Sequence, residues 1–185
     1  MEIENYTFSA FNDYTGNGIS CAITKFNAKE LAPIIICIGS DLVLGDSLGP
    51  LVGTLLKKKG VGVYVYGTLN YPITAKEIEN VQKHLKHMHP NSILVAVDAA
   101  VGLKDDVGNI RVVNKGLKPG TGVNKNLGEI GDVSIIGVVA GKSKENYDLF
   151  NLTRLGLIYK MAEKISNGIE DYIKNTFPCA DKKIM

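Results

Sequence analysis

Two short apolar runs constrain the fold of this chain more than any other feature. Residues 34–39 read IIICIG, and residues 92–100 read SILVAVDAA, which is apolar until Asp98. A strand that is apolar on both sides has no surface for water, so it belongs to a sheet that is covered on both faces. Sheets of this kind are mostly parallel, and their strands alternate with helices.

The rest of the chain continues this alternation. Further strands are expected at residues 61–67, 110–114 and 132–141, and helices at residues 45–60, 78–88 and about 146–175. Gly60 is a typical helix stop, and Thr74 to Glu77 form a capping box before the second helix. The pattern predicts a three-layer α/β/α fold with an open, mostly parallel sheet, in which 110–114 is the weaker strand, at an edge.

The order of the strands decides where a ligand can bind. Right-handed crossovers favour a 2-1-3 order for the first three strands, so that 34–39 lies between 61–67 and 92–100. The chain then leaves 34–39 and 92–100 toward opposite faces of the sheet. Ligands bind at such a switch point, beyond the carboxyl ends of the strands.

Two aspartates are expected to meet at this point. Asp98 ends the strand 92–100, and Asp46, 52 positions earlier, follows the strand 34–39. Neighbouring strands are about 4.8 Å apart, and two carboxylates that close share a proton, so that one activates water while the other donates. This chemistry suits peptide hydrolysis. As alternatives, Asp46 or Ser47 caps the following helix, and Asp98 holds a loop through backbone N–H groups.

Other candidates for the site are weaker. Asp41 follows the first strand and either forms an Asx-turn or binds substrate. The glycine-rich loop 116–128 can present backbone N–H groups to a substrate carbonyl or to an anion. Its candidate substrate-binding residues are Gly120, Thr121, Gly122 and Asn124. Lys125 in the same loop is interpreted as an exposed lysine, with an electrophilic role as the alternative.

Several classes of function are not indicated. The net charge of +2 and the scattered lysines do not favour nucleic acid, and no apolar run is long enough to cross a membrane. The N-terminus does not resemble a signal peptide, so a cytoplasmic protein is expected. Three distant cysteines form no metal-binding pattern, and His84, His87 and His89 fall at the opposite end of the sheet from Asp98. No cofactor and no metal are therefore expected.

The chain is expected to form one domain over residues 1–185, since no linker or repeat divides the sequence. Residues of about 1–30 and 178–185 are interpreted as peripheral to it. Apolar residues on the long helix of about 146–175 leave a homodimer open as an alternative to a monomer.

Three motifs in order resemble a known family. They are GSDLVLGDSLGPLVG (39–53), LVAVDAAVG (94–102) and KPGTGVNKNLGEIGDVSIIGVVA (118–140). Together they resemble the YyaC sporulation proteins over nearly the whole chain from about residue 30. More distantly, the core resembles the germination protease that degrades small acid-soluble proteins in spores. The resemblance implies the phosphorylase/hydrolase-like (HybD-like) fold of hydrogenase-maturation endopeptidases.

The resemblance also implies roles for the two aspartates. Asp46 and Asp98 match the aspartates proposed to catalyse in the germination protease, and they match acidic metal-binding positions of the maturation endopeptidases. Those enzymes add a histidine after the second acid, whereas no histidine follows Asp98 here. The resemblance therefore implies a sporulation-associated endopeptidase with a metal-free aspartate pair, acting on protein or peptide substrates, among them small spore proteins, inside the spore or forespore. An inactive partner-binding protein and a metal-dependent maturation-type endopeptidase remain alternatives.

Overall fold

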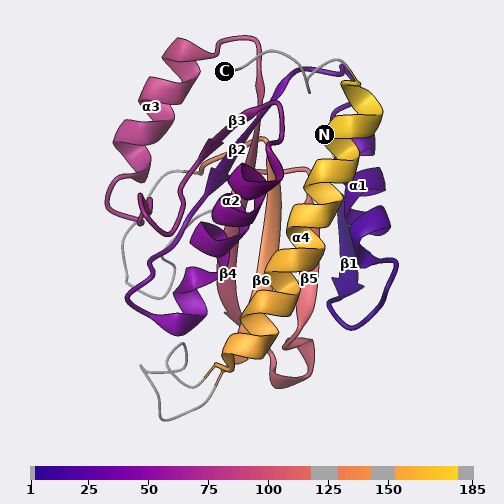
Figure 1. Cartoon of the computed structure of the whole chain (residues 1–185), viewed down its shortest axis with the longest axis vertical. Helices are drawn as coiled ribbons and strands as arrows, with labels where there is room; N and C mark the ends of the chain where they lie inside the picture. The colour runs from indigo at the N-terminus through magenta and orange to yellow at the C-terminus, as the bar shows by residue number, and fades with distance from the viewer. Residues whose placement is uncertain (1–2, 118–128, 143–152, 179–185) are drawn as a thin grey trace.

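The computed structural model of the chain describes residues 3–117, 129–142 and 153–178. Its six strands are β1 (Asn5–Ser9), β2 (Pro33–Cys37), β3 (Tyr64–Tyr66), β4 (Ile93–Gly102), β5 (Asn109–Val113) and β6 (Val133–Gly141). Its helices are α1 (Thr15–Phe26), α2 (Leu48–Lys59), α3 (Ile78–Met88) and α4 (Leu155–Thr176), with short 3₁₀ helices η1 (Leu44–Ser47) and η2 (Lys104–Asp106). Figure 1 shows their arrangement.

The six strands form one sheet in the order β1-β5-β6-β4-β2-β3. Strands β3, β2, β4 and β6 are parallel, whereas β5 runs antiparallel to both β6 and β1. The predicted 2-1-3 order is confirmed, because β2 lies between β3 and β4. Helices α1, α2 and α4 pack on one face of the sheet and α3 packs on the other, which confirms the three-layer α/β/α fold.

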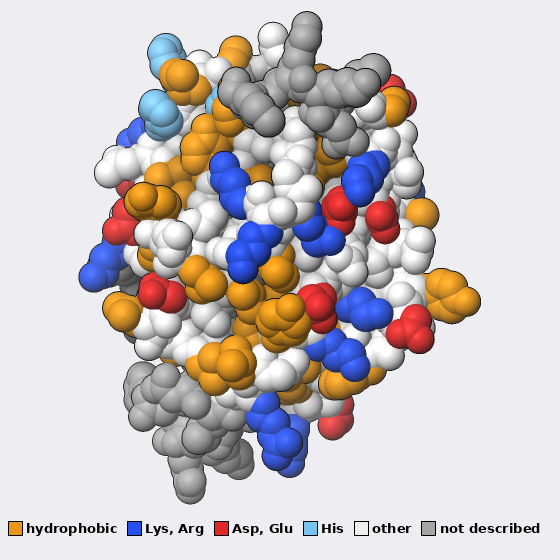
Figure 2. All heavy atoms as spheres, viewed as in Figure 1, with side chains coloured by type: hydrophobic (Ala, Val, Ile, Leu, Met, Phe, Trp, Pro, Cys, Tyr) orange, Lys and Arg blue, Asp and Glu red, His pale blue; other side chains and the backbone are white. Residues whose placement is uncertain are grey.

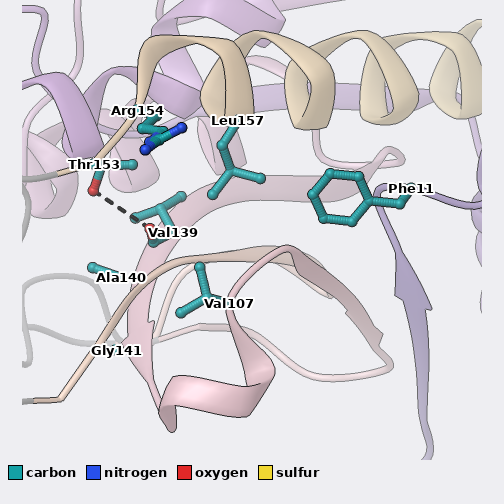
Figure 3. Close-up of a pocket in the computed structure, with 8 residues that line it drawn as sticks. All are labelled: Phe11, Val107, Val139, Ala140, Gly141, Thr153, Arg154 and Leu157. Carbon is teal, nitrogen blue, oxygen red and sulfur yellow. Dashed lines mark hydrogen bonds between the residues drawn. The ribbon is translucent and has the colours of Figure 1, made fainter.

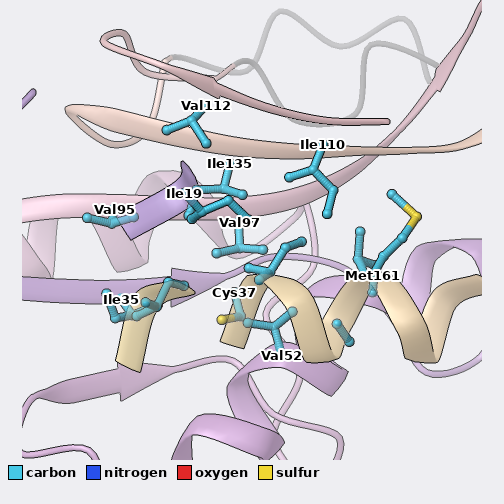
Figure 4. Packing of buried hydrophobic residues seen from close by; sticks show 14 of the residues in the cluster. Ile19, Ile35, Cys37, Val52, Val95, Val97, Ile110, Val112, Ile135 and Met161 are labelled. Atoms are coloured by element: carbon cyan, nitrogen blue, oxygen red, sulfur yellow. The ribbon is translucent and has the colours of Figure 1, made fainter. Parts of the chain in front are cut away.

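The central strands are buried on both faces, as their apolar composition predicts. In β2, Ile35 and Cys37 face α1, α2 and α4, whereas Ile34 and Ile36 face α3. Figure 4 shows the larger of the two clusters, with residues from β2, β4, β5 and β6 converging on the helices. Cys37 is fully buried, and burial raises the pKa of its thiol well above the ordinary value, so it is an inert core residue.

The first 30 residues are not peripheral, contrary to the expectation. Strand β1 pairs with β5 and forms the edge of the sheet, and helix α1 packs against α4. Ile19 and Ile23 of α1 have no exposed surface at all. Because β1 occupies the edge, β5 lies inside the sheet, and its expected place at an edge is wrong.

The helix boundaries agree with the sequence in two cases and differ in a third. Helix α2 ends at Gly60, which has the left-handed φ of +67° that favours glycine there. Before α3, the Thr74 N–H donates a hydrogen bond to Glu77 Oε2 at 2.9 Å, which is one half of the predicted capping box; Thr74 does not cap α3, because that helix begins at Ile78 with Glu77 at the N-cap position. Helix α4 begins at Leu155, later than the expected 146, and residues 143–152 lie outside the described residues.

No helix in the described part of the chain combines the length and the apolar character that a membrane span requires.

Candidate active site

The turn that leaves β2 brings Asp46 back over the end of that strand. Gly39 has a φ of +140°, and a Cβ at this position would lie 2.0 Å from the Asp46 carbonyl oxygen. The Ser40 N–H donates a hydrogen bond to the same oxygen at 3.1 Å. A second close approach is at Gly49 of α2, where a Cβ would lie 2.0 Å from the Ile38 carbonyl oxygen. The glycines therefore let η1 and α2 lie directly against the end of β2.

Asp46 does not cap helix α2; Ser47 occupies the N-cap position, but its side chain makes no cap hydrogen bond. Asp46 lies in η1, and neither Asp46 nor Ser47 makes a side-chain hydrogen bond to the first turn of α2. The Ser47 hydroxyl instead donates to the Leu44 carbonyl oxygen at 2.6 Å. The Asp46 side chain is half-buried, and burial raises its pKa, while the Ser40 backbone N–H favours the ionised form and opposes the shift.

Asp98 lies within β4 and not at its end, because the strand runs on to Gly102. The expected position is still correct relative to β2, whose pairing with β4 stops at Cys37 and Val97. Asp98 is thus the first residue of β4 beyond the end of β2. On its other side it pairs with Ile136 of β6. The side chain therefore lies where the chain leaves β2 to form η1.

The protonation of Asp98 is unusual for an aspartate. Burial raises the pKa of this half-buried carboxyl to about 8, against one hydrogen bond from the Ala99 N–H to Asp98 Oδ1 at 2.8 Å. The charge of Asp46 raises the pKa further. At pH 7 the Asp98 carboxyl is therefore mostly protonated, and the two carboxyls interact electrostatically.

The hydrogen bond of Asp98 does not support the alternative role, in which this residue holds a loop in place. Ala99 is the next residue of the same strand, so this contact stabilises no loop. Within the part of the chain that the structure describes, the Ala99 N–H is the one hydrogen-bond partner of this half-buried carboxyl, so its charged form is costly there.

Asp41 does not form the expected Asx-turn. The turn after β2 is closed by Ser40, whose Oγ accepts a hydrogen bond from the Leu42 N–H at 3.2 Å. Asp41 itself is exposed. Gly120, Thr121, Gly122, Asn124 and Lys125 lie outside the described residues, so their roles stay predictions.

The three histidines lie away from the aspartates. His84 and His87 are exposed on α3, and His89 packs on Tyr64 and Tyr66 at the end of that helix, where the chain turns into β4. Figure 2 shows histidine side chains at the α3 end of the molecule, whereas β4 ends at the opposite side in Figure 1. Within residues 3–117, 129–142 and 153–178, no group of three His, Cys, Asp or Glu side chains can hold a metal ion.

One hollow near the carboxyl end of β6 was not predicted. It measures about 390 Å³ and is lined by Phe11, Val107, Val139, Ala140, Gly141, Thr153, Arg154 and Leu157 (Figure 3). The lining side chains are mostly apolar, and the Thr153 hydroxyl donates to the Val139 carbonyl oxygen at 3.4 Å. Val139 belongs to the cluster under α1, α2 and α4, so this hollow lies on the other face of the sheet from Asp98.

Comparison with known proteins gives a consistent result. The family described as "Protein of unknown function (DUF1256)" matches residues 9–168. "Uncharacterized protein YyaC" of Bacillus subtilis (strain 168) is 37% identical over 152 residues, which are 82% of this chain and 73% of that protein.

A solved structure resembles the fold. It is the [NiFe] hydrogenase maturation protease HycI from Thermococcus kodakarensis KOD1, with a TM-score of 0.53 and 19% sequence identity. The match covers 78% of this chain and 94% of HycI. The chain thus has the three-layer HybD-like fold, and it belongs to the DUF1256 family and is a relative of YyaC.

Proposed function

We propose that this protein is an endopeptidase in which Asp46 and Asp98 share one proton and activate water. The observation that carries the proposal is the placement of two half-buried carboxyls at the switch point of the sheet. Asp98 is the first residue of β4 beyond the end of β2, and the Gly39 turn folds Asp46 back over the same end. Neither carboxyl is explained by helix capping or by support of a loop.

The two environments suggest different roles for the two acids. Asp98 has a pKa of about 8 and is mostly protonated at pH 7, so it donates a hydrogen bond to the carbonyl oxygen of the scissile peptide. Asp46 accepts a backbone N–H bond that favours its ionised form, and it takes a proton from water. The resulting hydroxide adds to the carbonyl carbon while Asp98 gives its proton to the oxygen.

The second half of the reaction returns the protons. Asp46, now protonated, transfers its proton to the amide nitrogen, and the C–N bond breaks. Asp98 recovers a proton from the hydroxyl of the tetrahedral intermediate as the carbonyl of the new carboxyl group forms. The pair ends the cycle with one proton, as it began, so no further acid or base is needed.

The comparisons support a hydrolase of this kind without naming the substrate. HycI is described as a hydrogenase maturation protease, and its fold is that of this chain. The resemblance to spore proteins leads us to propose protein or peptide substrates of the spore or forespore interior, including small spore proteins. Gly120, Thr121, Gly122 and Asn124 are the proposed contacts to the substrate backbone.

A metal-dependent reaction is not favoured by the described residues. A hydrolytic metal site typically uses three protein ligands, and no third His, Cys, Asp or Glu in the described part of the chain joins Asp46 and Asp98. These residues do not fit a resident metal ion, and we derive no step through one. That the protein works without a metal stays a prediction.

Cleavage of a protein substrate tests the proposal. Purified protein is incubated with candidate small spore proteins and with unfolded casein between pH 4 and pH 8, and the fragments are identified by mass spectrometry. We expect Asp46→Asn and Asp98→Asn each to lower the rate by at least about 100-fold. Asp13→Asn, which changes a fully exposed acid between β1 and α1, is the matched control and should stay within about twofold.

Two results would contradict the proposal. One is an absence of cleavage by the wild-type protein in every condition. The other is cleavage that Asp98→Asn leaves unchanged. If both variants still bind a spore protein that the wild type does not cleave, the protein is an inactive binding module.

A further inference from the structure

Arg111 lies in the same row across the sheet as Asp98. Asp98 of β4 pairs with Ile136 of β6, and Ile136 pairs with Arg111 of β5. Residues directly opposite each other on neighbouring strands point to the same face of a sheet. The three side chains therefore lie on one face, in the order Asp98, Ile136, Arg111.

The neighbours of these residues confirm which face this is. Val97, Ile135, Ile110 and Val112 point together into the cluster under the helices α1, α2 and α4 (Figure 4). Since side chains alternate along a strand, Asp98, Ile136 and Arg111 point to the face that carries α3. Ile136 indeed packs against the smaller cluster on that face.

Arg111 is held in place and remains accessible. Its Nη2 donates to Asp106 Oδ2 at 2.6 Å, and its side chain keeps 41% of its surface exposed. Asn109 Nδ2 lies 3.5 Å from the other Asp106 oxygen. The bond to Asp106 uses one nitrogen of the Arg111 guanidinium, which has five N–H donors in a rigid plane. The ion pair is part-buried, and it fixes the orientation of the guanidinium.

The spacing suits a contact to an extended substrate. Two strand spacings place the Arg111 Cα about 10 Å from the Asp98 Cα. An extended peptide advances about 3.3 Å per residue, so a group on Arg111 meets a substrate side chain two or three residues from the bond at Asp98.

We propose that Arg111 binds a carboxylate side chain of the substrate, two or three residues from the cleaved bond, and so determines specificity. The guanidinium matches a carboxylate in shape and charge, and Asp106 holds it ready in an orientation that leaves donors for the ligand. The inference rests on the proposed function, because it takes Asp98 as the place of the reaction. Arg111 is a specificity residue here and takes no part in the chemistry.

The test uses two sets of eight-residue peptides. In one set a Glu is placed at each position in turn, and in the other set a Gln takes its place, while the rest of the sequence is identical. For the wild type we expect kcat/KM to be about 10-fold higher with Glu than with Gln two or three residues from the cleaved bond. Arg111→Gln should reduce this ratio to below about twofold, chiefly through KM, and Arg111→Glu should reverse it in favour of the Gln peptides, because two carboxylates repel each other. Arg111→Lys should keep part of the preference, because the charge remains.

Lys115→Gln is the matched control. It removes the same charge from a side chain of similar exposure, 46%, which pairs with Glu129 at 3.2 Å. It lies four residues after Arg111, about 13 Å farther along an extended chain and toward the amino end of β4. This variant should leave the Glu to Gln ratio unchanged. A thermal melt of each variant shows whether it is folded.

The outcomes separate this inference from the proposed function. A wild-type ratio near one, or a preference that Arg111→Glu does not change, overturns the inference even when cleavage is fast. If nothing is cleaved, the same peptides carrying fluorescein are titrated by fluorescence polarisation. An about 10-fold lower Kd for the Glu peptides, lost in Arg111→Gln, then supports the inference although the proposed function has failed, and equal Kd values overturn it.

Discussion

Asp46 and Asp98 are 52 positions apart in the sequence, yet the charge of Asp46 raises the pKa of Asp98. The end of β2 brings them together. The pairing of β2 with β4 stops one residue before Asp98. The Gly39 turn then directs the chain back, so that Asp46 lies over the end of β2.

The turn at Gly39 should not tolerate a side chain. A Cβ there would lie 2.0 Å from the Asp46 carbonyl oxygen, and the φ of +140° is strained for any other residue. We expect Gly39→Ala to lower the free energy of unfolding by more than about 2 kcal/mol and to abolish cleavage. Urea denaturation at pH 7 measures the first effect.

Gly60→Ala provides the control for this prediction. Gly60 also has a positive φ, +67°, but a Cβ at this position would meet nothing within 4 Å. Gly60→Ala should lower the free energy of unfolding by only about 1 kcal/mol, from backbone strain. Equal costs for the two variants would show that the approach of Asp46 to Gly39 is not as close as described.

The stability of the protein should fall as the pH rises from about 4 to 8. Asp98 has a pKa of about 8 in the folded protein and about 3.9 in the unfolded chain. Between these values the folded state binds more protons than the unfolded state, so the free energy of unfolding decreases with pH. The contribution of the neutral carboxyl is fully present below pH 4 and is lost above pH 8.

Asp98→Asn should remove much of this dependence. The amide resembles the protonated acid and cannot ionise. We therefore expect the variant to match the wild type near pH 4 and to exceed its free energy of unfolding by about 2–4 kcal/mol at pH 9. Denaturant titrations at several pH values measure this, and Asp41→Asn, an exposed site, should show no such difference. A variant that is less stable than the wild type at pH 9 would contradict the assignment.

The rate of cleavage should depend on the proton of Asp98. If the neutral carboxyl donates to the scissile carbonyl, kcat/KM falls above about pH 8, where Asp98 ionises. The rate also falls in acid, where Asp46 becomes protonated and cannot accept a proton from water. A rate that still rises at pH 10 would exclude Asp98 as the acid.

Helix α1 should contribute to the core as strongly as the central strands. Ile23 is fully buried, so Ile23→Ala is expected to lower the free energy of unfolding by about 2–5 kcal/mol. Cys21→Ala, on the exposed side of the same helix, should change it by less than about 0.5 kcal/mol. Similar small effects at both positions would mean that α1 is peripheral after all.

The central strands and their order could be predicted because their signal is local. Each reads as an unbroken apolar run, and few topologies bury such strands on both faces. The position of Asp46 relative to Asp98 followed from that order. The exact relation did not, because it depends on where β2 stops pairing and on the close approach at Gly39, neither of which the residue pattern shows.

Helix α1 was missed because its sequence is a poor helix former in isolation. It contains Gly16 and Gly18, each of which costs about 1 kcal/mol in a helix interior. The structure gives a reason for Gly18, because a Cβ there would lie 2.4 Å from the Phe8 ring of β1. Tertiary packing thus overrides local propensity. The row of Asp98, Ile136 and Arg111 was also missed, because it depends on the registers of β6 with β4 and with β5.

Titration of the aspartate carboxyls tests the central claim most directly. Protein labelled with ¹³C at the aspartate carboxyl carbon is followed by NMR from pH 3 to pH 10, in the wild type and in Asp46→Asn. We predict one carboxyl that titrates near pH 8, is absent in Asp98→Asn, and moves to lower pH in Asp46→Asn because the neighbouring charge is gone. If every aspartate titrates below about pH 5, or the Asp98 titration is the same without Asp46, the two residues are not a proton-sharing pair.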